Sequence, residues 1–247
     1  MMTKEIMDLK EIAGYLGFSE TKIYRLIKAD AIPYAKIGGQ YRFVKSEIDE
    51  WLKGKGKISK GDLWDRIKNE KDKLTRCLLT IGLLTKEMEK SGVKPVVVGG
   101  QAVEFYTAGG YATMDIDIVT SGYDLAGNIL KSWGFTKEGR HWSSEELDLS
   151  IEIPASVLAG DDSKITEVDI EGLTVYMIGV EDLIIDRINA YVHWGSKDDG
   201  TWAKELMLLN KDQIDWKYLQ KRATTEKTEK ALKDLCEDLL KKGGNPV

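Results

Sequence analysis

The chain has 247 residues, of which 42% are hydrophobic and 31% are charged, as in a globular protein with one large or two modest domains. No apolar run approaches the ~20 residues of a membrane span, and the N-terminus lacks the apolar core of a signal peptide. We therefore expect a cytoplasmic protein that does not enter the membrane. The two distant cysteines, Cys77 and Cys236, are expected to be reduced, buried thiols, and with two histidines they make a zinc site a poor fit.

The net charge of −5 is unevenly distributed. Residues 1–57 carry 11 Lys+Arg and 8 Asp+Glu, whereas the remainder carries 25 and 33. A mildly basic head on an acidic body indicates that the head meets an anionic partner, although chance alone could produce so small an excess.

The sequence pattern divides the chain into three sections, residues 1–55, 56–92 and 93–247. The Gly/Lys tract from Lys53 to Gly61 is typical of a flexible linker. One long helix is predicted from Asp62 to Lys90, where Ser91-Gly92 ends it. Apolar residues at helical spacing in its later part should dock on the third section.

The first section contains the pattern of two short helices separated by a tight turn. Gly17-Phe18-Ser19 forms the turn, with Ser19 as the N-cap of a helix over residues 20–28. Residues 32–44 then predict a hairpin with Gly38-Gly39 at its tip. A third helix should complete a small core with Ile48, Trp51 and Leu52.

This section resembles the excisionase-type winged helix-turn-helix, which is related to MerR-like heads. The resemblance implies DNA contact through the second helix and the wing, which here means Ser19, Thr21, Lys22, Tyr24, Arg25 and Arg42. The alternative is that the head is a module for protein interaction or dimerisation. One head makes few phosphate contacts, which favours a homodimer or DNA held by other means.

The third section mixes strands and helices. Strands are predicted over residues 94–100, 112–120, 147–154 and 172–179. Helices are predicted over residues 101–106, 181–194, 198–208, 212–223 and 228–242, with Trp194 and Trp202 in the core.

Two carboxylates share one face of the second strand. Asp115 and Asp117 project together while Ile116 and Ile118 point into the core. Such neighbours repel each other, and no Lys or Arg lies between Lys94 and Lys131 to pair with them. A divalent cation bound by both carboxylates would remove the conflict, and Mg²⁺ prefers oxygen ligands of this kind.

The Gly99-Gly100 pair lies where the first strand ends and a helix begins. Free backbone N–H groups at such a helix start can bind phosphate, and the absent Cβ atoms allow close approach. Together with the aspartates, this turn predicts a nucleoside triphosphate site.

The order strand, Gly-Gly, helix, strand, Asp-x-Asp resembles the nucleotidyltransferase (polymerase β-like) superfamily. Val98-Gly99-Gly100 and Asp115-Ile116-Asp117-Ile118 carry the resemblance, and Thr113 matches many members. Three departures are a slightly long gap after Gly100, Gly100 in place of a serine, and Tyr111 in place of an arginine. The implied fold is α+β, with a winged helix-turn-helix head, a helical linker, and a mixed-sheet core followed by C-terminal helices.

The resemblance also implies a catalytic metal site with Mg²⁺ or Mn²⁺ on Asp115, Asp117 and a third carboxylate. Asp148 and Glu152 are candidates, and we choose Glu152 because residues 149–153 match one branch of the superfamily. Gly99, Gly100, Thr113 and Arg187 are expected to bind the nucleotide, although Arg187 could equally form a structural ion pair with Asp186.

The function implied is the transfer of a nucleoside monophosphate from a nucleoside triphosphate to an acceptor hydroxyl. The branch includes toxin components of toxin–antitoxin systems, so the acceptor would be a tRNA 3′ end or a protein hydroxyl. One alternative is a DNA-binding regulator whose body senses nucleotide without catalysis. Another is an enzyme that modifies small molecules such as antibiotics.

Overall fold

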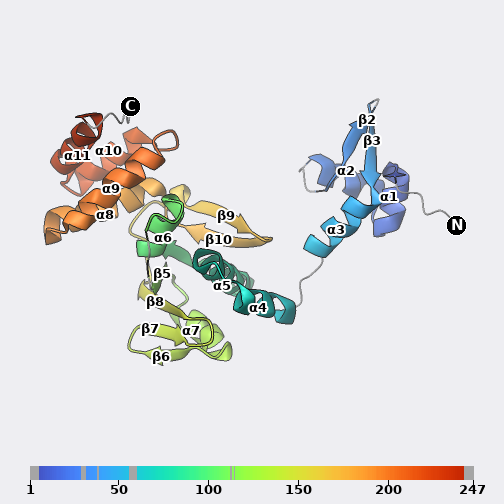
Figure 1. Cartoon of the computed structure of the whole chain (residues 1–247), viewed down its shortest axis with the longest axis horizontal. Coiled ribbons are helices and arrows are strands. Elements are labelled where there is room, and N and C mark those ends of the chain that lie inside the picture. Colours follow the sequence, from blue (N-terminus) through green and yellow to red (C-terminus); the bar gives the residue numbers. More distant parts are fainter. Residues whose placement is uncertain are drawn as a thin grey trace. The chain divides into compact units, whose positions relative to one another are not determined.

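The computed structural model describes residues 6–28, 32–37, 39–55, 60–111, 113 and 115–241. These residues form two compact units that meet in the chain between Asp65 and Arg66, and the bar in Figure 1 locates each by colour. The predicted α+β class is confirmed, with a small helix-and-sheet unit at the N-terminus and a larger mixed-sheet unit after it.

The first unit is a helix-turn-helix followed by a hairpin. Its elements are β1 (Ile6–Met7), α1 (Leu9–Leu16), α2 (Glu20–Lys28), β2 (Ala35–Ile37), β3 (Gln40–Val44) and α3 (Lys45–Lys55). A capping box between Asp8 and Glu11 begins α1, and Gly17, with a φ of 66°, ends it in the left-handed conformation that glycine favours. These two signals fix the turn before α2.

The core of this unit contains Ile12, Ile23, Phe43 and Ile48, all fully buried. The unpredicted strand β1 pairs with β3, which places β3 between β1 and β2 in a three-stranded sheet. The prediction that Leu52 completes the core is wrong, because this side chain is 37% exposed while Trp51 packs against the core. Of the predicted hairpin tip, Gly38 lies outside the described residues.

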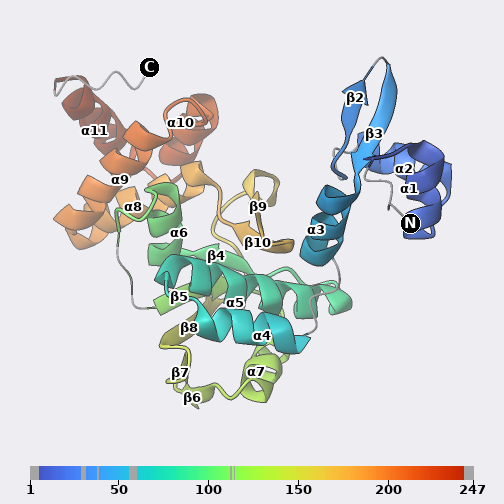
Figure 2. The same ribbon diagram turned by 45° about the vertical axis from the view of Figure 1, so that its right-hand side comes forward.

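The single long helix predicted from Asp62 to Lys90 is two helices, α4 (Lys60–Asn69) and α5 (Lys73–Met88) (Figure 2). Asp72 has extended backbone and its side chain accepts a hydrogen bond from the Thr75 N–H, so it caps α5 and interrupts the helical run. The predicted linker tract is helical at both ends, and its residues 56–59 lie outside the described part of the chain. Helix α5 contacts β10 and α7 of the larger unit.

A seven-stranded mixed sheet forms the centre of the second unit. Its spatial order is β6-β7-β8-β5-β4-β10-β9. The strands are β4 (Val96–Val98), β5 (Asp115–Val119), β6 (Thr136–Glu138), β7 (His141–Ser144), β8 (Leu149–Ala155), β9 (Thr166–Ile170) and β10 (Leu173–Met177). Strand β5 runs antiparallel to β4 and parallel to β8.

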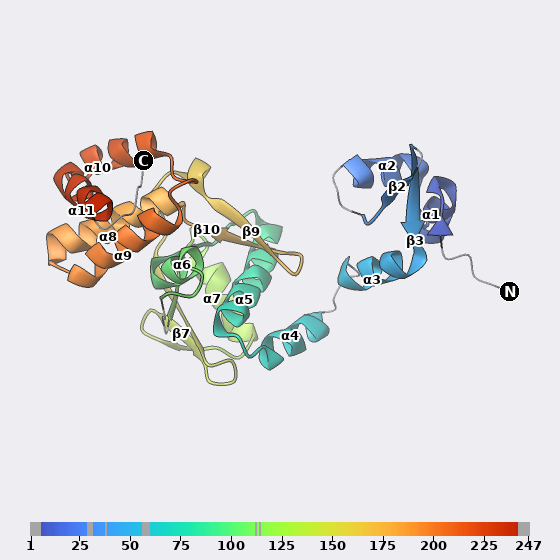
Figure 3. The same cartoon turned by 45° about the horizontal axis from the view of Figure 1, so that its top comes forward.

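Helices surround the sheet and extend beyond it. They are α6 (Gly99–Tyr106), α7 (Tyr123–Ser132), α8 (Val180–Trp194), α9 (Lys197–Leu209), α10 (Trp216–Thr225) and α11 (Glu229–Lys241). The last four gather into one cluster, and α6 contacts both α8 and α9 (Figure 3). No described helix combines the length and apolar character of a membrane span.

Of the two tryptophans placed in the core by prediction, Trp194 is exposed. It is the last residue of α8 and its side chain is 83% accessible, so that prediction is wrong. Trp202 is half-buried on α9, with its ring edge-to-face against Tyr111 at 4.9 Å between centroids.

Candidate active site

Three carboxylates meet on two neighbouring strands. Asp115 and Asp117 lie on β5, and their Cα partners across the parallel ladder to β8 are Ser150 and Glu152. All four residues are half-buried, and the isoleucines that alternate with them are buried on the opposite face. The register therefore brings Glu152 directly beside Asp117.

The Gly99-Gly100 turn packs against the same aspartate. Val98, the last residue of β4, is the cross-strand partner of Asp117, and the Gly100 N–H donates a hydrogen bond to the Asp117 carboxylate. Gly99 has a φ of +63°, and a Cβ there would lie 2.1 Å from Asp117 Oδ2. Both its conformation and its contact with Asp117 therefore require glycine.

At Gly100 the space beside the missing Cβ holds side chains of the loop between α6 and β5. A Cβ would lie 2.9 Å from Tyr111 Cε1 and 3.0 Å from Thr113 Oγ1. The Thr113 hydroxyl donates to the backbone carbonyl of Asp115 at 3.2 Å. Thr113 thus joins the turn to the start of β5, and a phosphate at this turn would depend on backbone N–H groups at the start of α6.

The carboxylate cluster shifts the pKa of Asp117. Burial, followed by repulsion from Glu152 and Asp115, raises its pKa to about 6, and the Gly100 N–H and Arg187 only partly offset the rise. Within the described residues, no basic side chain forms an ion pair with Asp115 or Asp117. Two oxygen-donor groups in mutual repulsion are a donor set suited to Mg²⁺ or Mn²⁺.

Glu152 has a different environment. Its Oε1 lies 2.7 Å from Arg140 Nε, and its Oε2 lies 3.7 Å from His141 Nδ1. In the part of the chain that the structure describes, no group of three His, Cys, Asp or Glu side chains stands ready to hold a metal ion. The three carboxylates share one face, but Glu152 is engaged by a guanidinium.

Arg187 is close to this cluster without being free. It lies on α8 and pairs with Asp186 at 2.5 Å and with Asp199 of α9 at 2.8 Å. Its Nε is buried and makes no hydrogen bond. The alternative prediction, an ion pair between Arg187 and Asp186, is therefore present, and Asp199 is a second partner of Arg187.

Two basic residues near the site escaped sequence reasoning. Arg140 comes from the β6–β7 turn, and Lys73 of α5 donates a hydrogen bond to the Thr113 carbonyl at 3.0 Å. Both reach the site from elements far from the aspartates in the chain. Arg140 directly precedes His141, which is the first residue of β7 and the Cα partner of Glu152, but β7 was not predicted from the sequence.

The predicted DNA-contacting residues lie on the first unit. On α2, Thr21, Lys22, Tyr24 and Arg25 are exposed, whereas Ile23 and Ile27 face the core. The Ser19 hydroxyl accepts a hydrogen bond from the Lys22 N–H at 3.3 Å, and Lys22 covers the Phe18 ring.

Arg42 lies on the β2–β3 hairpin that forms the wing. Its guanidinium donates to the Tyr41 carbonyl at 2.9 Å and to Gln40 Oε1 at 2.5 Å. Tyr41 in turn meets Tyr24 of α2 edge-to-face, with 6.1 Å between ring centroids. Helix α2 and the wing therefore form one continuous polar and aromatic surface.

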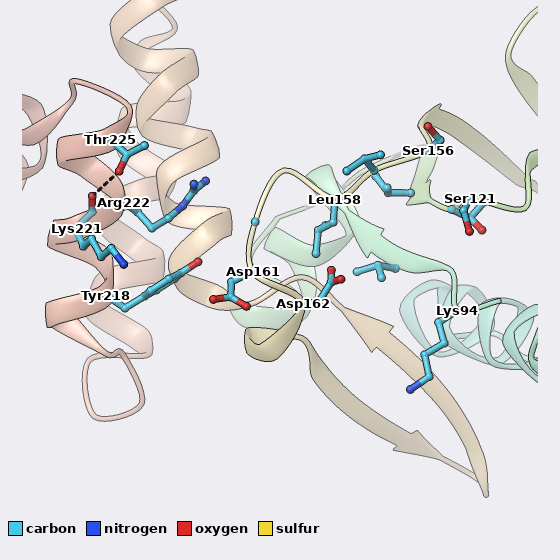
Figure 4. Close-up of a pocket in the computed structure, with 15 residues that line it drawn as sticks. Lys94, Ser121, Ser156, Leu158, Asp161, Asp162, Tyr218, Lys221, Arg222 and Thr225 are labelled. Atoms are coloured by element: carbon cyan, nitrogen blue, oxygen red, sulfur yellow. Dashed lines mark hydrogen bonds between the residues drawn. The ribbon is translucent and has the colours of Figure 1, made fainter. Parts of the chain in front are cut away.

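A cavity of about 730 Å³ lies apart from the carboxylates, at the opposite ends of β4 and β5 (Figure 4). Lys94 and Ser121 line it from the sheet side, and Tyr218, Lys221 and Arg222 line it from α10. The predicted catalytic and nucleotide-binding residues are absent from its lining. This cavity is therefore separate from the candidate active site.

Comparisons with known proteins identify both units. A family model described as a nucleotidyltransferase of unknown function (DUF6036) matches residues 72–239, and a helix-turn-helix domain model matches residues 6–56. The second match shows that the first unit is a helix-turn-helix domain. No curated protein matches the chain.

Two solved structures are similar to this chain at low identity. The crystal structure of an antigenic nucleotidyltransferase-like protein from Paracoccidioides brasiliensis is 15% identical, with a TM-score of 0.46. The match covers 67% of this chain and 92% of that one. The solution structure of the antibiotic-resistance factor ANT(2'')-Ia is also 15% identical, with a TM-score of 0.43, and covers 64% of this chain and 94% of that one.

Proposed function

Because the chain belongs to the DUF6036 family of nucleotidyltransferases through residues 72–239, we propose that its second unit moves a nucleoside monophosphate from a nucleoside triphosphate to an acceptor hydroxyl. The observation that carries the proposal is the register of β5 and β8, which sets Glu152 beside Asp117. The Gly99-Gly100 turn against the same aspartate adds backbone N–H groups for phosphate.

The proposed chemistry assigns a task to each carboxylate. Asp115 and Asp117 would hold the divalent cation, Mg²⁺ or Mn²⁺. Glu152 accepts the proton of the acceptor hydroxyl as its oxygen bonds to the α-phosphorus and pyrophosphate leaves. When bound, the cation neutralises triphosphate charge and lowers the pKa of a coordinated hydroxyl. The chain itself supplies positioning and charge, which is most of what phosphoryl-type transfer requires.

We also propose that the helix-turn-helix domain binds DNA through α2 and the wing. The exposed set Thr21, Lys22, Tyr24 and Arg25 supports this, because Lys and Arg contact phosphates or guanine and the hydroxyls suit phosphate oxygens. DNA binding would bring the transferase to a chromosomal site or to its own promoter.

A labelling experiment tests the transferase. The full chain is incubated with each α-labelled triphosphate, Mg²⁺ and a cell lysate, and the RNA and protein fractions are then separated. We expect one triphosphate to label one fraction, the tRNA or a protein, and the label to disappear with Asp117→Asn and Glu152→Gln. A Lys86→Ala variant, on the exposed side of α5, serves as the control and should retain labelling.

The ion pair of Glu152 with Arg140 favours a second candidate function, a nucleotide sensor that does not catalyse. A sensor would bind triphosphate tightly and release no pyrophosphate with either acceptor class. The same experiment separates the two functions if bound nucleotide and released pyrophosphate are both measured. Tight binding of triphosphate without release of pyrophosphate would show that the second unit is a sensor and not a transferase.

A further inference from the structure

Arg140 presents a positive charge at the edge of the carboxylate cluster. It lies in the turn between β6 and β7, and its side chain is 68% exposed, whereas Glu152 is 12% exposed. The next residue, His141, is the Cα partner of Glu152 in the antiparallel β7–β8 ladder. The hairpin backbone is thus fixed beside Glu152, while most of the Arg140 side chain that pairs with Glu152 is exposed to water.

This ion pair can be broken at low cost. An exposed arginine loses little on leaving a carboxylate, because water solvates its guanidinium. Glu152 cannot leave, because β8 is paired on both sides, with β5 and β7. Any exchange of partners at this site therefore involves movement of Arg140.

The charges explain why an exchange would occur. Without ligand, Asp115, Asp117 and Glu152 repel one another, and Arg140 neutralises the charge of Glu152. A cation bound to the aspartates would neutralise the carboxylate charge in place of Arg140. A triphosphate carries several negative charges, and the guanidinium fork matches phosphate oxygens in two parallel hydrogen bonds.

We propose that Arg140 exchanges partners, pairing with Glu152 in the ligand-free protein and with the triphosphate in the nucleotide complex. The proposal rests on the proposed function and deepens it, because it names a phosphate-binding residue that lies outside the Gly-Gly and Asp-x-Asp motif. Arg140 is then a substrate-positioning residue that also sets how easily Glu152 becomes available.

The exchange predicts two effects of opposite sign for Arg140→Ala. Binding of Mn²⁺ alone, followed by electron paramagnetic resonance, should tighten about three- to tenfold because Glu152 loses its competing cation. Binding of fluorescent ATP and GTP derivatives in the presence of Ca²⁺ should weaken about tenfold because a phosphate contact is lost. Arg140→Lys keeps the charge without the fork and should fall between Arg140→Ala and the wild type in both assays.

Lys137→Ala is the matched control. Lys137 lies on the same hairpin, and its substitution by alanine removes the same charge. Its ammonium, however, lies over the rings of Tyr123 and Trp142. Lys137→Ala should change neither binding constant more than about twofold. Melting temperatures of all variants establish that each is folded.

The outcomes separate this inference from the function on which it rests. If Arg140→Ala weakens both Mn²⁺ and triphosphate binding, the hairpin is only a structural support and the exchange is wrong. If the wild type binds triphosphate and Arg140→Ala binds it equally well, Arg140 is no phosphate ligand and the transferase proposal stands. If the wild type binds no triphosphate under any condition, the proposed function fails and the exchange fails with it.

Discussion

Asp117 and Glu152 are direct neighbours across two parallel strands, although a helix and a hairpin separate them in the chain. Their juxtaposition is unfavourable without a ligand, because two half-buried carboxylates repel each other and Asp115 adds a third charge. Burial and this repulsion together raise the pKa of Asp117 to about 6. The candidate site therefore reduces the stability of the free protein at neutral pH.

The first prediction concerns Asp117→Asn in the presence of EDTA. The ordinary pKa of this carboxyl is 3.8. Because the folded-state pKa is higher, the stability contribution of Asp117 is full below about pH 4 and is lost as pH rises towards 6. The asparagine removes this loss and still accepts from the Gly100 N–H. We expect a gain of about 1–2 kcal/mol at pH 8, after allowance for partial solvent screening, and a smaller gain at pH 5.

Urea unfolding at both pH values measures the effect. Asp124→Asn, at an exposed position in the first turn of α7, is the control and should show no such gain at pH 8. A variant Asp117→Asn that is less stable than the wild type at pH 8 would show that the carboxylate is favourably solvated or paired.

The second prediction concerns Gly99→Ala. The added Cβ would lie 2.1 Å from Asp117 Oδ2, and the φ of +63° is strained for alanine. We expect a loss of about 2–4 kcal/mol in unfolding free energy and loss of transferase labelling. Gly172 has a φ of +79°, and a Cβ there would have no atom within 4 Å. Gly172→Ala therefore measures the cost of the backbone strain without a steric clash. It should cost about 1 kcal/mol and leave labelling intact.

Equal effects of the two substitutions would mean that Asp117 moves aside easily. In that case the contact between Asp117 and the Gly-Gly turn would not hold the carboxylate in place, and the turn would be constrained by its backbone alone.

The nucleotide-site motif could be predicted because its signals are local. The apolar residues of β4, the Gly-Gly pair and the alternation from Asp115 to Ile118 each depend on residues close in sequence. The position of Glu152 could not be predicted from local sequence, because the parallel register between β5 and β8 depends on the whole connection between these strands. Glu152 was chosen by resemblance, and the register places it beside Asp117.

Features that depend on distant or polar partners escaped prediction. Strand β6, with the sequence Thr-Lys-Glu, is exposed throughout and carries no apolar alternation. Arg140 was missed because a counterion for the carboxylates was sought only in the adjacent sequence. The break between α4 and α5 contains no Gly or Pro, and the capping pair Asp72 and Thr75 was the signal that could have revealed it.

The third prediction tests the helix-turn-helix domain with Arg25→Ala. Arg25 is exposed on α2 and belongs to the surface proposed to meet DNA. If it contacts a phosphate, binding to labelled duplex DNA should weaken by about 1–2 kcal/mol, and the salt dependence should lose about one unit of slope. Anisotropy over a salt series measures both quantities. Lys86→Ala, which removes a charge from the second unit, should leave both quantities unchanged. If Arg25→Ala binds DNA as tightly as the wild type and with the same salt dependence, Arg25 does not belong to the interface.

The last prediction concerns Asp182, whose side chain is inaccessible and whose hydrogen-bond partners line the cavity of about 730 Å³. Its carboxylate accepts hydrogen bonds from the Tyr218 hydroxyl at 2.9 Å, from Arg222 Nε at 2.9 Å and from the Asp161 N–H at 3.0 Å. These bonds join α8, α10 and the loop after β8. Removing the carboxylate leaves Arg222 partly buried without its main counterion, so Asp182→Ala should cost about 3–5 kcal/mol.

Two further variants serve as comparisons for Asp182→Ala, because each removes fewer or weaker interactions than the loss of the Asp182 carboxylate does. Tyr218→Phe removes one donor and should cost about 1 kcal/mol. Asp238→Ala removes an exposed carboxylate 3.9 Å from Lys204 and should cost less than about 1 kcal/mol. Chemical unfolding gives all three values. A cost for Asp182→Ala no larger than that of Tyr218→Phe would mean that water replaces the carboxylate, and that the cavity wall is held by apolar contacts instead.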